Sequence, residues 1–178
     1  FQELESHGLI RDEQRLLQSL HKQLAVLAKA RDRIQLAQEE VSSLEKWVDL
    51  TTTQDQLKRF RYVRGLIGTI PNSEQDQARQ ALLAHPDVEV DVVFSSETEH
   101  GVVVLYKSGD LTDLQDTLTS SHFKEFDYQG ESLPKERLEQ LKREIKEQGA
   151  VEAATLETLS QAKEDINQLK YQLDYVLS

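Results

Sequence analysis

The five histidines are the first residues to test for chemistry, because imidazole binds metals and transfers protons near neutral pH. None of them stands at the His-x-His or His-Glu-x-x-His spacing of a local metal site, and the chain has no cysteine. The histidines are His7, His21, His85, His100 and His122. The sequence therefore predicts no metal site, no thiol chemistry and no disulfide.

Paired carboxylates and glycine-rich loops also offer no catalytic pattern. The pairs Glu39–Glu40 and Glu164–Asp165 occupy adjacent positions in helical segments, so their side chains point apart. Gly65 and Gly68 lack the spacing of a dinucleotide fingerprint or a P-loop, and the chain has no Gly-Lys-Ser/Thr. We expect no catalytic residue, no bound cofactor and no enzymatic activity in this chain.

Long helices are predicted at both ends of the chain, because apolar residues recur there at steps of three or four. The first helix lies between about Asp12 and Trp47 and contains neither Gly nor Pro. The second begins at Pro134, a residue suited to a first helical turn. The first stripe comprises Leu17, Leu20, Leu24, Leu27, Ala30, Ile34, Ala37, Val41, Leu44 and Val48.

Each predicted helix has one irregular point. In the first, consecutive steps of three meet at Leu27 and Ala30, which resembles a stammer in a heptad pattern. In the second, small residues around Gly149 and Ala150 interrupt the stripe, and they would permit a bend or a close helix–helix approach. We expect these four residues to be candidate points of flexure.

The segment between the helices, about residues 59 to 133, is richer in β-branched residues and turn signals. Its apolar runs predict four strands with a helix after the first strand and another after the third. The strands are expected at 60–70, 88–94, 101–106 and 123–128, and the helices at 74–84, capped by Ser73, and from the cap Asp110 onward. The order β-α-β-β-α-β is that of the ferredoxin-like fold.

The predicted fold class is therefore α+β: a long antiparallel two-helix coiled-coil arm with an inserted ferredoxin-like (βαββαβ) lobe. The first arm comprises 1–58, the lobe 59–133 and the returning arm 134–178. The net charge of −11 divides into about −2, −7 and −2 over these parts. The lobe thus carries most of the negative charge, which favours a basic protein partner over a nucleic acid.

Other classes with this strand order fit the residues poorly. An RNA-binding version would stack bases on aromatic residues of its third strand, where this chain has Val102, Val103 and Val104. A metallochaperone would need a Cys-x-x-Cys loop. No apolar run approaches the roughly 20 residues of a membrane-spanning helix. Because the chain begins with Phe1 and has no Met, we expect it to be a piece of a longer protein.

Two stretches at the ends of the lobe resemble a known family. The entry, Tyr62-Val-Arg-Gly-Leu-Ile-Gly-Thr-Ile-Pro71, and the exit, Gly130-Glu-Ser-Leu-Pro-Lys-Glu-Arg-Leu-Glu-Gln-Leu141, are similar to the corresponding steps in the cytoplasmic domain of subunit I (subunit a) of V/A-type rotary ATPases. The order of long helix, lobe and long helix also matches that family over essentially the whole chain. "GTIP" alone is a weak motif, and its position between two long helices makes it more specific.

The resemblance implies a function that the spacing alone does not. In that family the lobe is the distal lobe of a stator, and it binds a peripheral stalk made of an E–G coiled-coil heterodimer. A membrane half, absent from this chain, takes part in proton or sodium transport. The resemblance thus implies a place on the cytoplasmic side of a membrane, tethered through the absent C-terminal membrane domain. No ion-pathway residue can be assigned to this chain.

The partner surface is expected on the open face of the lobe's sheet. If Val88, Val90, Val92 and Phe94 face the helices, then Glu89 and Asp91 face outward. We expect Tyr62, Arg64 and Tyr106 on that same open face. A solvated sheet surface without a partner is the alternative for all five.

A second class of protein stays open at this point, namely the hinge plus coiled coil of an SMC-like ATPase. There the lobe would dimerise, whereas a stator arm would be monomeric alone and would bind a stalk heterodimer.

Overall fold

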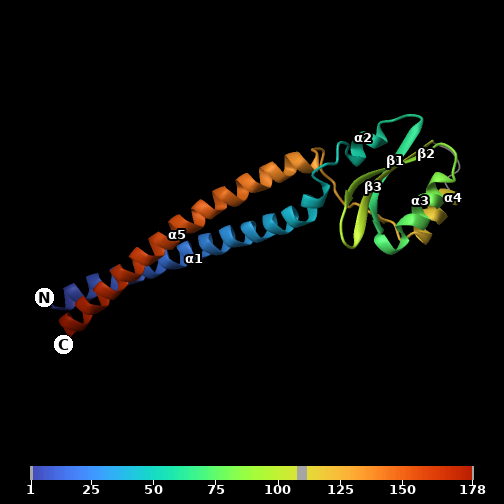
Figure 1. Ribbon diagram of the computed structural model, residues 1–178. Helices are drawn as coiled ribbons and strands as arrows, with labels where there is room; N and C mark the ends of the chain where they lie inside the picture. The colour runs from blue at the N-terminus through green and yellow to red at the C-terminus, as the bar shows by residue number, and fades with distance from the viewer. Residues whose placement is uncertain (1, 108–111, 178) are drawn as a thin grey trace. The chain divides into compact units, whose positions relative to one another are not determined.

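The computed structural model describes residues 2–107 and 112–177 (Figure 1). The chain forms two compact units. One comprises residues 1–40 and 141–178 and is called the hairpin unit. The other comprises Val41–Gln140 and is called the lobe unit. The order of the elements is helix, lobe and helix, and the α+β fold class is as predicted.

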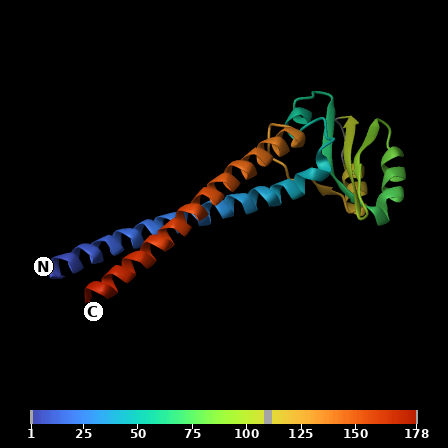
Figure 2. The same cartoon turned by 60° about the vertical axis from the view of Figure 1, so that its left-hand side comes forward.

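The hairpin unit consists of the greater parts of two long helices, α1 (Gln2–Leu44) and α5 (Pro134–Leu177), of 43 and 44 residues. Their residues 41–44 and 134–140 belong to the lobe unit. Each is continuous, and a helix of that length extends about 65 Å. The two views show α1 and α5 side by side and antiparallel, with both chain ends at the same end of the unit (Figures 1 and 2). Helix α5 starts at Pro134 as the sequence predicts.

Most covered side chains follow a heptad along both helices, at alternating steps of three and four, which is the seam of a coiled coil. On α1 they are Ser6, Leu9, Glu13, Leu16, Leu20, Gln23, Leu27, Ala30, Ile34 and Ala37. On α5 they are Leu141, Ile145, Gln148, Glu152, Thr155, Leu159, Ala162, Ile166, Leu169, Leu173 and Val176. The seam thus accepts polar residues without breaking the register.

This register corrects the predicted stripe of the first helix. Leu17 and Leu24 are 40% and 45% exposed, and Leu16 and Gln23 occupy the seam in their place. The steps through Leu27 are then regular, so the interpretation of that segment as a stammer was wrong. The sequence pattern misled because it followed every leucine, whereas packing selects positions by their angle around the helix.

The second helix needs the same correction. Thr155 is 5% exposed and lies in the seam, whereas the next residue, Leu156, is 42% exposed although the spacing of leucines favours it. The seam therefore continues through the small residues rather than stopping at them. A Cβ placed on Gly149 would meet no atom of its described surroundings within 4 Å, so glycine is not required there for a close helix approach.

The lobe unit is built on a four-stranded sheet of β1 (Val63–Pro71), β2 (Val88–Ser95), β3 (Glu99–Lys107) and β4 (Lys124–Glu125). The strand order is β2-β3-β1-β4, and every neighbouring pair is antiparallel. Helix α3 (Gln75–Leu83) follows β1, and helix α4 (Thr112–Ser120) follows β3. This order and connectivity confirm the ferredoxin-like prediction.

Helices α3 and α4 cover one face of the sheet, which we call the first face (Figure 1). Its core joins the two helices to alternate residues of β1 and β3: Ile70, Ala78, Leu82, Val102, Val104, Leu114 and Leu118. Leu82 and Val104 are fully buried. Alternation along the strands places these residues on one face, which is why the pattern was visible in the sequence.

Several element ends differ from the predictions. Ser73 is not the cap of α3, because a 3₁₀ turn, η2 (Asn72–Glu74), precedes that helix and the residue at the cap position, Glu74, makes no capping bond with its side chain. Strand β1 begins at Val63 rather than at residue 60, and β4 is only two residues long. The predicted cap Asp110 lies outside the described residues. The lobe unit also extends beyond 59–133 on both sides.

Candidate functional site

The face of the sheet opposite α3 and α4, which we call the second face, is not open as expected. A 3₁₀ turn, η1 (Glu45–Trp47), and a short helix, α2 (Gln54–Lys58), supply residues that cover much of it. The buried members of this second core are Trp47, Leu50, Leu57, Ile67 and Val103. The sheet is thus buried on both faces, although the first cover comes from helices and the second from an irregular segment.

A capping box explains why α2 forms at that point. The Thr53 hydroxyl accepts a hydrogen bond from the Gln56 amide at 3.1 Å, and the Gln56 side chain accepts one from the Thr53 amide at 3.1 Å. Together these bonds satisfy two free amide groups at the start of the helix. Gly65 then allows Leu57 to lie against β1, because a Cβ at Gly65 would approach the Leu57 methyl carbon to 2.7 Å. The Thr-x-x-Gln pattern at Thr53 is the signal in the sequence for this capping box.

A β-bulge sends Phe94 to the second face. The β2–β3 register shifts between Val92 and Phe94, so that Phe94 pairs with Gly101. Phe94 therefore leaves the face of Val88 and Val90, and its predicted position beside the helices was wrong. Its ring meets Trp47 edge-on at a centroid distance of 4.9 Å. Trp47 also stacks on Phe126 at 4.3 Å.

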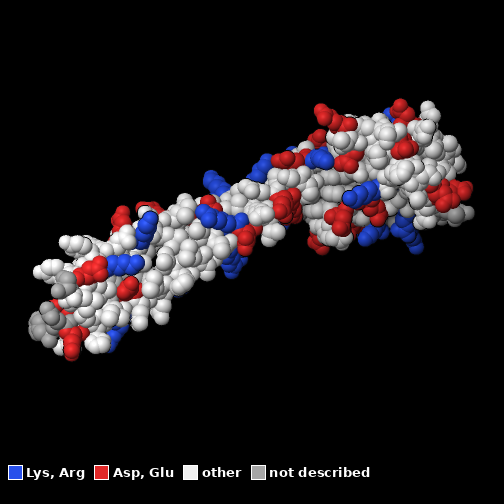
Figure 3. Space-filling model, turned by 90° about the horizontal axis from the view of Figure 1, so that it is seen from below, with Lys and Arg blue, Asp and Glu red and all other residues white. Residues whose placement is uncertain are grey.

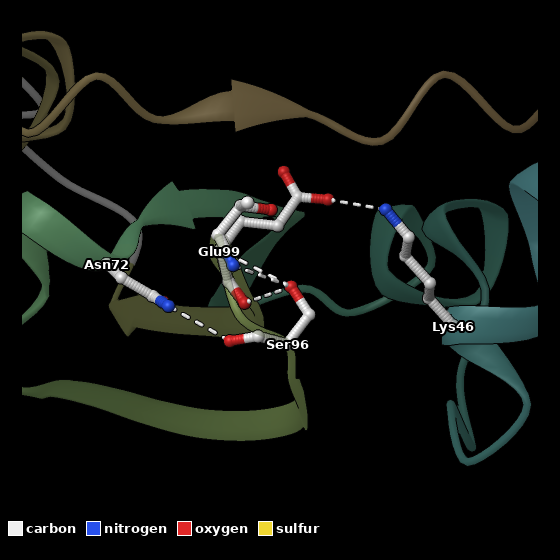
Figure 4. A network of polar contacts seen from close by, with 5 residues as sticks. Lys46, Asn72, Ser96 and Glu99 are labelled. Carbon is white, nitrogen blue, oxygen red and sulfur yellow. Dashed lines mark hydrogen bonds and ion pairs between the residues drawn. The ribbon is translucent and has the colours of Figure 1, made fainter.

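The segment from η1 through α2 to Phe60 is called the covering segment. A polar network joins its start to the β2–β3 turn (Figure 4). Lys46 Nζ lies 3.1 Å from the Glu99 carboxylate, and the Ser96 hydroxyl donates to the Glu99 carbonyl oxygen at 2.9 Å. Asn72 donates from its side chain to the Ser96 carbonyl oxygen at 2.9 Å. These bonds place Trp47 over the second face, so their role is structural.

Beside the second core lies a groove of about 540 Å³, which we call the second-face groove. Most of its lining is apolar, and the exposed fractions of Phe60 and Val63 are 54% and 39%. The charged residues among its lining are Asp49 and Asp91. An apolar groove with a negatively charged lining fits a partner segment that is apolar on one side and basic at its edge.

The predicted partner residues divide between the two faces. Glu89 and Asp91 pair with Leu105 and Val103, whose side chains belong to the second face, so both carboxylates face away from α3 and α4 as expected. Tyr106, in contrast, packs against the core of the first face, and its expected position on the open face was wrong.

Arg64 lies on the same face of the sheet as Tyr106, because the two residues are cross-strand partners. Tyr62 precedes β1 and is 72% exposed. The five residues therefore do not form one surface.

Arg64 and Tyr106 line a separate recess of about 490 Å³ with Glu125, Asp127 and Tyr128. Burial raises the pKa of the Tyr106 phenol, the positive charge of Arg64 opposes that shift, and Glu125 adds to it. The lining carries both signs of charge and a tyrosine that retains its proton. Such a recess is a polar corner of the lobe.

The flexure candidates lie in the hairpin unit. Leu27 and Ala30 are buried seam residues of α1, exposed by 7% and 2%. Gly149 and Ala150 lie inside the continuous α5. The Thr155 hydroxyl donates to the Val151 carbonyl oxygen at 2.7 Å, and such a bond within a helix favours a slight bend. Flexure at these positions stays a prediction.

Charges on the hairpin unit are mixed. Acidic and basic side chains alternate along the helices on the face seen in Figure 3. Arg31 of α1 and Glu152 of α5 form an ion pair at 3.3 Å between the two helices. Because both groups are partly exposed, this pair contributes little to stability.

The described residues contain no group of three or more His, Cys, Asp or Glu side chains placed to hold a metal ion. None of the described helices has both the length and the apolar character needed to cross a membrane.

Comparison with known proteins gives one solved structure to report. No family model matches the chain, and no curated protein matches it. The chain is similar to the crystal structure of the cytoplasmic N-terminal domain of subunit I, homolog of subunit a, of V-ATPase. The sequence identity is 16% and the TM-score 0.45, over 94% of this chain and 53% of that one. The chain thus spans about half the length of that domain.

Proposed function

We propose that the chain is a non-catalytic stator element of a V/A-type rotary ATPase. Its lobe binds the peripheral-stalk E–G heterodimer and links that stalk to the membrane sector, which transports protons or sodium ions. The observation that carries the proposal is the insertion of a βαββαβ lobe, entered by the Tyr62–Pro71 motif, between two long helices with a shared heptad seam.

The glycines of that motif support the proposal because they have a definite structural role. Gly65 admits Leu57 of the covering segment, and a Cβ at Gly68 would overlap the Lys124 carbonyl oxygen and the Phe123 ring. The motif therefore marks a strand that accepts close neighbours on both faces. The two glycines of the motif are therefore a structural requirement of this lobe rather than a coincidence of sequence.

The hairpin unit supports a mechanical role. Two helices joined along a continuous seam resist bending better than one, and their charged outer faces keep the unit in water. In the proposed role this unit is the spacer between the stalk-binding lobe and the rest of a longer protein. Recognition then belongs to the lobe, with Glu89 and Asp91 as the predicted contact residues on its second face.

The experiment is a measurement of mass in solution, by light scattering after size exclusion, on the 178-residue chain alone and with a purified E–G heterodimer. A stator element is expected to be monomeric alone and to form a 1:1:1 complex with E and G. A chain that dimerises through its lobe and ignores the heterodimer would instead support the hinge of an SMC-like ATPase.

A further inference from the structure

We propose that the second-face groove binds a single amphipathic helix of a partner protein, with its apolar stripe in the groove and a row of Lys or Arg beside Asp49 and Asp91. This inference adds a site and a binding mode to the proposed function, on which it rests for the identity of the partner. The binding site itself is inferred from the shape, exposure and charge of the groove, and it does not depend on the proposed function.

The shape and lining of the groove favour a helix. Its floor is formed by Val103 and Leu105 of β3, and one wall by the covering segment with Leu50 and Phe60. The other wall is β2, with Val93 at the bulge. An open apolar trough between a sheet and an irregular segment accepts side chains spaced at i, i+3, i+4 and i+7, as helix-in-groove complexes do.

The apolar residues around the groove remain exposed in the part of the chain that the structure describes. Phe60 and Val63 are 54% and 39% exposed, whereas the core of the first face is covered by α3 and α4. Aromatic anchors at the rim of an apolar trough are typical of binding hot spots. We therefore assign Phe60 as the main apolar contact.

Charge complementarity determines the sign of the charge that the partner helix must carry. Asp49 and Asp91 are exposed residues of the lining, and Glu89 lies on the same face of β2. Among the described residues that line the groove none is basic, although Arg59 and Arg61 adjoin Phe60 along the chain. A helix with acidic flanks would be repelled by the groove carboxylates, so a basic flank is required on the side of β2.

A peptide experiment tests the groove without a stalk. The probe is a designed helical peptide with Leu at i, i+3, i+4 and i+7 and Lys on both flanks, and its control has Glu in place of Lys. Binding to the full chain is followed by calorimetry and by the methyl NMR signals of Val93, Val103 and Leu105. We expect the Lys peptide to bind and shift those signals, and the Glu peptide to bind at least about tenfold more weakly.

Two variants of the chain separate the groove from general charge attraction. The double variant Asp49→Lys with Asp91→Lys is expected to lower the affinity for the Lys peptide about tenfold or more. Glu97→Lys with Asp116→Lys, which makes the same change in net charge away from the groove, is expected to leave the affinity within about twofold. Phe60→Ser keeps all charges and is expected to lower the affinity for the Lys peptide and to reduce the NMR shifts that it causes. This variant tests the groove even if the charge variant folds poorly.

Equal weakening by the two charge variants, or NMR shifts that avoid the three groove residues, would overturn the inference. The same variants are then titrated with the E–G heterodimer. If the heterodimer binds wild type and both charge variants equally, the groove is not its site although the proposed function stands. If it does not bind wild type while the Lys peptide occupies the groove, the proposed function fails and the groove stands.

Discussion

The hairpin unit and the lobe unit bury their apolar residues in different ways. The seam of the hairpin is one stripe wide and includes Gln23 and Thr155, while the lobe sheet is covered on both faces and contains fully buried side chains such as Leu82 and Val104. Stability in the hairpin is therefore spread over its length, whereas stability in the lobe depends on a few central residues. A spacer tolerates the first arrangement, and a recognition surface of fixed shape needs the second.

The largest expected effect comes from the core of the first face. Leu82→Ala removes a fully buried side chain between α3 and the sheet, and we expect it to lower the free energy of unfolding by about 2–5 kcal/mol. Denaturant unfolding followed by fluorescence measures this directly, because Trp47 is the only tryptophan and reports on the lobe.

Leu173→Ala in the hairpin seam is the matched variant for that measurement. Leu173 is 8% exposed, and we expect its loss to reduce helical circular dichroism at lower denaturant while the Trp47 transition stays in place. If Leu173→Ala moves the Trp47 transition as far as Leu82→Ala does, then the contrast between the two units is wrong.

A smaller loss is expected at the bulge. Gly101→Ala would place a Cβ on the Phe94 ring, so either the ring or the strand must move. We expect a loss of about 1–3 kcal/mol in unfolding free energy and a change in Trp47 fluorescence, because Phe94 contacts the indole. Gly8→Ala in α1 is the control for the lobe, since its Cβ would meet nothing within 4 Å among the described residues and Trp47 fluorescence should not change.

Gly149→Ala is expected to increase stability, unlike the preceding substitutions. The position is inside α5 and has space for a Cβ, so alanine should raise the helix's stability by about 1 kcal/mol. Thermal unfolding by circular dichroism measures this gain. If flexure at Gly149 is real, solution scattering should also show a stiffer or straighter hairpin. A loss of stability instead would mean that another helix approaches Gly149 more closely than the structure shows.

The smallest effect concerns pH. Burial raises the pKa of Tyr106 above its ordinary value of 10.0, so the folded chain holds the phenol proton more tightly than the unfolded chain. The stability from this group is fully present below pH about 10 and is lost as pH rises through the folded pKa. Tyr106→Phe should therefore flatten the alkaline fall in unfolding midpoint, and Tyr171→Phe on exposed α5 should not. Identical alkaline curves for Tyr106→Phe and wild type would refute this role of burial.

The sequence predicted the parts of each unit that depend on regular periodicity. Alternation in β2 and the apolar runs of β1 and β3 indicated the sheet, and the spacing of leucines indicated two long helices. Three features did not follow from periodicity. The bulge moved Phe94 to the other face, a capping box formed α2, and the seam used Gln23 instead of Leu24.

The candidate site was the least predictable region for the same reason. Its groove combines an irregular segment around Leu50 and Phe60 with β2 and β3, which are distant in the chain. Glu89 and Asp91 were placed correctly because they lie before the bulge, where alternation still holds. Tyr106 was misplaced because only the cross-strand register identifies its face.

The most direct test of the central claim is hydrogen–deuterium exchange of the full chain with and without the E–G heterodimer. If the lobe recognises the stalk and the hairpin serves as a spacer, added protection should be confined to the lobe, in the segments around 49–63 and 88–105. Protection along α1 and α5, with the lobe unchanged, would contradict that division of roles.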